Sequence, residues 1–78
     1  MKSISMPLPV VSGVQAVRAF ERAGWVIARQ RGSHIILKKP VTFHTLSVPD
    51  HEELDPGTLR SLIRKARLTV EEFTALLG

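Results

Sequence analysis

The hexapeptide RQRGSH, residues 29–34, gathers residue types that could hold a phosphate and move a proton beside it. Arginine offers a planar, permanently charged fork that matches phosphate oxygens. Histidine exchanges protons near neutral pH because its unperturbed pKa is about 6.5. Gly32 permits a positive φ angle, so a tight hairpin turn could bring these groups together. A polar turn with one solvated histidine has the same composition, and this simpler interpretation stays open.

This combination of residues suits the cleavage of RNA, which carries its own nucleophile, the 2′-hydroxyl. Such cleavage needs a base for the 2′ proton, an acid for the leaving 5′ oxygen and cations that hold the phosphate. His34 could act as the base or the acid, and Arg29, Arg31 and Lys38 could supply the cations. The second proton transfer would fall to His51 or to water, so such an enzyme should be slow.

Other chemistries find little support in the sequence. The three histidines, His34, His44 and His51, have no metal-ligand spacing, and cysteine is absent, so we expect no metal site. Ser33 stands beside His34, but adjacent residues of a strand point to opposite faces, which disfavours a serine nucleophile and leaves Ser33 at most an auxiliary role. No glycine-rich phosphate loop opens a helix, so we also expect no cofactor.

Composition favours a small domain with an anionic partner. Seventy-eight residues make one domain, and a net charge of +4 with eleven lysines and arginines favours nucleic acid first and acidic protein second. A charge of this size also serves solubility alone. The sequence has no apolar run long enough to span a membrane and no signal-peptide core. We therefore expect a soluble cytoplasmic protein without membrane contact.

The first helix should span residues 13–23. Ser12 and Gln15 have the spacing of a capping box, and Gly24 stands where a left-handed C-cap is expected. The helical period gives one apolar face: Val14, Ala16, Val17, Phe20 and Ala23. Residues 1–11 show no helical or strand period, so we expect an extended arm before a single domain at 12–78. The arm could contact the domain through Leu8, Val10 and Val11.

Three strands are expected next, at Trp25–Arg29, His34–Lys39 and Thr42–Val48, with a turn at Gln30–Ser33. Prolines 40 and 49 should end the second and third strands, because proline cannot donate to a ladder. Alternation does not settle which face points inward. We favour the face of Ile35 and Leu37, which leaves His34 and Lys38 accessible.

Two helices should close the chain. Asp55 caps the first and Pro56 occupies its first position, while Thr69 and Glu72 form a second capping box. The first of these helices has an apolar face, Leu59, Leu62, Ile63 and Ala66, and an opposite basic face with Arg60 and Arg64 as further candidate RNA contacts. The order α-β-β-β-α-α predicts a two-layer α+β sandwich. One face of its sheet must meet water or a partner.

The segments PVVSGVQAVRAFERAGW, RQRGSH and VPDHEELDPGTLRSLIRKARLTVEEF resemble the HicA toxins, small ribonucleases of bacterial and archaeal toxin–antitoxin pairs. The resemblance implies a fold like that of double-stranded-RNA-binding domains and cleavage of messenger RNA. It also implies neutralisation by a HicB-like antitoxin protein, through which an oligomer could form. The family's catalytic histidine follows Gly-Ser, and that position here is His34.

The sequence departs from the family pattern at some positions. Arg67 replaces the glycine that commonly ends the second helix, and KKPVTF replaces an Asp-Gly turn between the second and third strands.

Two rival interpretations of the function stay open. One is a non-catalytic RNA-binding module or inactive family member, and the other is a protein-interaction domain whose basic face docks an acidic partner.

Overall fold

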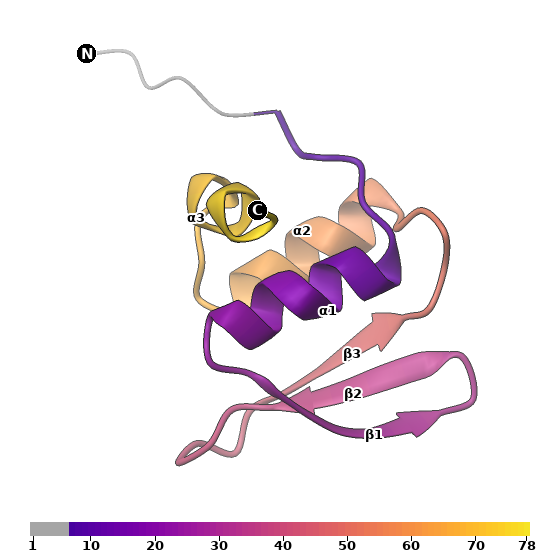
Figure 1. Ribbon diagram of the computed structural model, residues 1–78, viewed down its shortest axis with the longest axis vertical. Helices are drawn as coiled ribbons and strands as arrows, with labels where there is room; N and C mark the ends of the chain where they lie inside the picture. The colour runs from indigo at the N-terminus through magenta and orange to yellow at the C-terminus, as the bar shows by residue number, and fades with distance from the viewer. Residues whose placement is uncertain (1–6) are drawn as a thin grey trace.

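A computed structural model describes residues 7–78 and shows two layers, with the helices on one face of a sheet (Figure 1). The elements are α1 (Gly13–Arg22), β1 (Val26–Arg31), β2 (His34–Lys38), β3 (Thr45–Pro49), α2 (Pro56–Lys65) and α3 (Val70–Leu76). The three strands form an antiparallel meander in the order β1-β2-β3. The predicted α+β class and element order are confirmed, and the arrangement is consistent with the fold of double-stranded-RNA-binding domains.

The predicted helix starts are confirmed by their hydrogen bonds. At α1 the Gln15 N–H donates to the Ser12 hydroxyl (3.1 Å), and the Ser12 N–H donates to the Gln15 side chain (2.8 Å). The same reciprocal pair opens α3 at Thr69 and Glu72. The Asp55 carboxylate accepts from the Gly57 N–H at 3.0 Å, directly before α2. These local bonds satisfy orphan N–H groups, so each helix begins where its cap stands.

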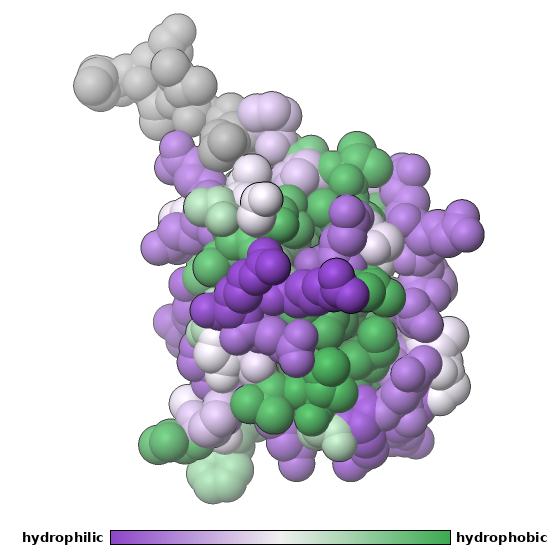
Figure 2. Space-filling model, viewed as in Figure 1, coloured by the Kyte–Doolittle hydropathy of each residue, from purple (hydrophilic) through white to green (hydrophobic). Residues whose placement is uncertain are grey.

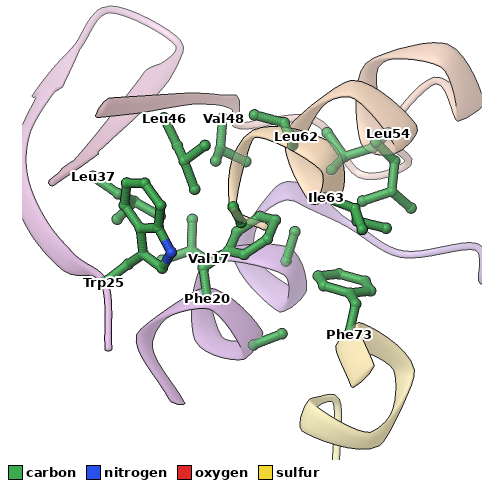
Figure 3. Packing of buried hydrophobic residues seen from close by; sticks show 14 of the residues in the cluster. Val17, Phe20, Trp25, Leu37, Leu46, Val48, Leu54, Leu62, Ile63 and Phe73 are labelled. Atoms are coloured by element: carbon green, nitrogen blue, oxygen red, sulfur yellow. The ribbon is translucent and has the colours of Figure 1, made fainter. Parts of the chain in front are cut away.

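The core lies between the sheet and the helices, and Figure 3 shows its packing. Ile35 and Leu37 face inward from β2, as expected, which leaves His34 and Lys38 exposed on the opposite face. The rings of Phe20 and Phe73 lie 5.2 Å apart and join α1 to α3. The remaining large buried side chains are Val11, Val17, Trp25, Leu46, Val48, Leu54, Leu59, Leu62 and Ile63. The sheet is therefore covered on one face only.

Two expectations about the apolar residues are wrong. Val14 is 45% exposed, because the buried face of α1 is centred on Ala16 and Phe20, and Ala19 completes it instead. Val10 is 76% exposed and is not part of the core, whereas Val11 is buried and Leu8 packs against the core. Part of the predicted arm, residues 1–6, lies outside the described residues, and residues 7–12 form neither helix nor strand.

Two strand boundaries differ from the prediction by two residues or more, and the others by at most one residue; Pro49, expected to follow the third strand, is its last residue. β1 continues to Arg31 because the turn is only Gly32 and Ser33, and Gly32 takes the positive φ of 57° that such a tight turn needs. β3 begins at Thr45 rather than residue 42. Residues 42–44 do not extend this strand, because β2 ends at Lys38, the partner of Thr45, and the Thr42 N–H donates instead to the Lys39 carbonyl at 3.2 Å, in a turn that contains Pro40 and Val41 (φ 72°).

Candidate nucleic-acid interface

A β-bulge in β1 directs two arginines to the uncovered face of the sheet. Ile27 pairs with Leu37, and the register then shifts at Ala28, so that Arg29 pairs with Ile36. Directly opposite residues share a face. Ile27 therefore lies on the helix side with buried Leu37, whereas Arg29 lies on the uncovered side. Without the bulge, strict alternation would place Ile27 and Arg29 on the same face.

Beyond the bulge, β1 brings Arg31 directly opposite His34. Both side chains are exposed, and together with Ile36 and Ser47 they line a hollow of about 350 Å³ on the uncovered face. The turn sets this geometry, because two residues between the strands fix the pairing of the two that flank it. A guanidinium and an imidazole therefore flank the same open space, which could hold a phosphate beside a proton donor or acceptor.

The loop after β3 is held against this end of the sheet. Pro49 is the cross-strand partner of His34 on its other side, and the N–H of Asp50 donates to the Ser33 carbonyl at 2.7 Å. The Gly13 N–H, at the start of α1, donates to the His51 carbonyl at 2.9 Å. Ser33 and His51, the two auxiliary candidates, therefore lie on segments that converge on the His34 end of the sheet.

Lys38, the last residue of β2, and Lys39, the first residue of the following loop, differ in role. The Lys39 ammonium donates to the Ala23 carbonyl at 2.6 Å, and it lies 5.7 Å from the centre of the Trp25 ring. Lys39 thus caps the end of α1, where cations are favoured. Lys38 is exposed on the uncovered face, four residues along β2 from His34, a separation of roughly 13 Å.

The remaining candidate cations lie elsewhere. Arg60 and Arg64 are exposed on α2, in the layer that packs on the other face of the sheet. The fold therefore brings Arg29, Arg31, His34 and Lys38 onto one face and leaves Arg60 and Arg64 in a separate layer.

Ser47 is the polar lining residue that sequence analysis did not select. It pairs with Ile36 across the sheet and lies next to the Arg31–His34 pair. Alternation from buried Leu46 and Val48 does place Ser47 on the uncovered face, but only the β2–β3 register shows that it reaches the His34 hollow. Within residues 7–78, no three histidine, aspartate or glutamate side chains gather as a metal site.

A short antiparallel sheet, helices on one face and a basic, histidine-containing opposite face define a small two-layer α+β domain with one open, cationic sheet face. Residues 13–68 match the family model described as HicA toxin of bacterial toxin–antitoxin. The match covers most of the chain, so the chain belongs to the HicA family, toxins that are paired with an antitoxin. A search of curated proteins finds no match. In the described part of the chain, no helix is long and apolar enough to cross a membrane.

Proposed function

We propose that this protein is an endoribonuclease that cuts messenger RNA, with His34 as its catalytic acid or base and a HicB-like antitoxin as its partner. The observation that carries the proposal is the cross-strand pair of Arg31 and His34, exposed together on the uncovered face of the sheet. Family membership supports the same function.

The proposed reaction uses the RNA's own 2′-oxygen. This oxygen attacks the adjacent phosphorus as its proton passes to a base, and the bond from phosphorus to the 5′ oxygen breaks as that oxygen takes a proton from an acid. The products are a 2′,3′-cyclic phosphate and a free 5′-hydroxyl. His34 carries out one of these transfers, and Arg31 and Arg29 neutralise the phosphate oxygens as charge develops.

The second proton transfer has two candidates. The loop of His51 is held near Ser33 by the Asp50–Ser33 hydrogen bond of 2.7 Å, so the His51 imidazole could serve, with solvent as the alternative. Because His34 is exposed, water has free access to the reacting atoms. This access weakens electrostatic stabilisation relative to a closed site and supports a slow enzyme. All groups in this scheme belong to RNA or protein, so it requires no metal ion.

The variant His34→Ala tests this function. With general acid–base catalysis removed, the rate of RNA cleavage at saturating RNA should fall about 10²- to 10⁴-fold. The assay is run in excess EDTA, with the cyclic phosphate product measured. Circular dichroism and denaturant unfolding should stay close to those of the parent, because His34 is exposed.

His44→Ala is the matched control, since it also removes an exposed imidazole but lies before β3, in the loop at the opposite end of the sheet. Its effect on the rate at saturating RNA should be much smaller, and His51→Ala should be intermediate if His51 assists. A folded His34→Ala protein that cleaves RNA at the parental rate would overturn the assignment. RNA that is bound and never cut by the parent would favour the non-catalytic module.

A further inference from the structure

The loop between β2 and β3 carries a fully exposed aromatic ring. Phe43 and Val41 are both completely exposed, at 103% and 102%, unlike the other aromatic residues of the described chain, which are buried. Apolar atoms protrude at the lower left of Figure 2, where Figure 1 places this loop. A phenylalanine ring in this position presents its π surface to solvent, so it is available to stack on a flat partner.

Two basic side chains lie on one side of Phe43. Phe43, His44 and Thr45 line a hollow of about 440 Å³. Lys65, the last residue of α2, and Arg67, two residues beyond it, line the same hollow. None of these lining residues is acidic. An aromatic ring beside two basic side chains is a combination that binds a base and its phosphate in single-stranded nucleic acid.

On its other side Phe43 borders the uncovered face of the sheet. It lines a second hollow of about 440 Å³, whose members include Lys38 and Val26. Lys38 shares its sheet face with His34. A track of cations therefore leads from Arg31 and His34 along β2 to Lys38, and past Phe43 to the end of α2.

We propose that Phe43, Lys65 and Arg67 form a second RNA contact that takes an unpaired nucleotide outside the cleavage site. The base stacks on Phe43, and the phosphate lies against the two cations. The inference rests on the proposed function for its choice of RNA, and it deepens that function by specifying an unpaired substrate. A ring can stack only on a base whose face is free, so a continuous duplex cannot use this contact.

Binding is measured in the His34→Ala background, so that RNA stays intact. Single-stranded oligoadenylate is titrated against the parent and against Phe43→Ala, with the same strand in duplex form as the second probe. Phe43→Ala should weaken single-strand binding about 5- to 150-fold, the loss expected for one stacked base, and should leave duplex binding unchanged. Val41→Ala is the matched control, because it truncates an equally exposed apolar side chain of the same loop that has no ring.

The variant Phe43→Trp gives a direct signal of stacking. The only native tryptophan, Trp25, is buried, so the new indole at position 43 would report on its own surroundings. Oligoadenylate should quench its fluorescence and bind at least as tightly as to the parent. Unchanged single-strand affinity in Phe43→Ala overturns the inference, as does loss of antitoxin binding with RNA affinity kept, which would assign the ring to a protein partner.

Cleavage by the chain with His34 intact separates this inference from the proposed function. If that chain cuts RNA while Phe43→Ala binds as the parent does, the second contact is wrong and the nuclease stands. If it does not cut RNA, but single-strand binding depends on Phe43, the contact stands and the nuclease is wrong. If neither form of RNA binds at low salt, both are wrong.

Discussion

Arg67 combines an unfavourable backbone conformation with an exposed charge. It follows α2 with a φ of 62°, in the left-handed region where a Cβ atom costs about 1 kcal/mol or more. Glycine would take this conformation without that cost. The guanidinium, however, lines the hollow beside Phe43. If Arg67 contacts RNA beside Phe43, as inferred above, the chain accepts a small loss of stability at this residue and gains a cation next to the RNA.

Arg67→Gly should therefore raise the free energy of unfolding by about 1 kcal/mol, because it relieves the left-handed strain. Urea denaturation measures the change. Arg67→Ala is the matched control, since it removes the same charge but keeps a Cβ atom, and it should show no comparable gain. A free energy of unfolding that is lower in Arg67→Gly than in Arg67→Ala would show that strain at this position is not the dominant effect.

At the scale of elements, the start of α1 depends on the absence of one side chain. A Cβ atom at Gly13 would lie 2.0 Å from the carbonyl oxygen of Pro49, which is backbone and has little freedom to move. This close approach lets α1 sit directly on the end of β3. The hydrogen bond from the Gly13 N–H to the His51 carbonyl then holds the loop beside His34.

Gly13→Ala should destabilise the fold by about 1–3 kcal/mol, the usual cost of overpacking, even though alanine favours helix by about 1 kcal/mol. Denaturant unfolding measures the loss. Gly57→Ala is the matched control in the first turn of α2, where a Cβ atom would meet only the end of the Asp55 side chain, at 3.2 Å. Equal stabilities of the two variants would mean that α1 shifts at no cost, and the argument from Pro49 would fail.

Short-range sequence patterns are sufficient to predict most of the helices and strands. Caps at Ser12, Asp55 and Thr69 are short-range patterns, so their helices were predicted correctly. The bulge at Ala28 and the late start of β3 were not predictable in this way, because each depends on pairing with β2. Period-two alternation fails across a bulge, so the shared face of Arg29 and His34 could be seen only in the paired sheet.

The candidate site was predictable in its residue types and less so in its arrangement. RQRGSH predicted a tight turn carrying Arg31 and His34, and the structure does place these two opposite each other. No sequence pattern predicts the cations beside Phe43, because they come from the end of α2, more than twenty residues away in the chain. Contacts between segments so far apart depend on the packing of layers, which local patterns do not encode.

At the scale of the whole molecule, the five candidate RNA-binding cations selected from the sequence form two sets separated by the core. Arg29, Arg31 and Lys38 share the uncovered face of the sheet with His34, whereas Arg60 and Arg64 lie on α2 in the helix layer. A substrate held at His34 must run along the uncovered face to reach Phe43. The two sets should therefore contribute unequally to RNA affinity.

The salt dependence of RNA affinity measures this inequality. For single strands, the slope of log affinity against log salt is about −0.7 for each neutralised phosphate, so Arg31→Ala and Lys38→Ala should each make the slope shallower by up to about that amount. Arg60→Ala and Arg64→Ala are matched controls, because each also removes one exposed positive charge, but from α2 in the helix layer. These two variants should leave the slope nearly unchanged. All variants are compared in the His34→Ala background with one oligonucleotide. A slope that responds to Arg60 and Arg64 as strongly as to Arg31 and Lys38 would show that RNA also contacts the face of α2 that carries Arg60 and Arg64.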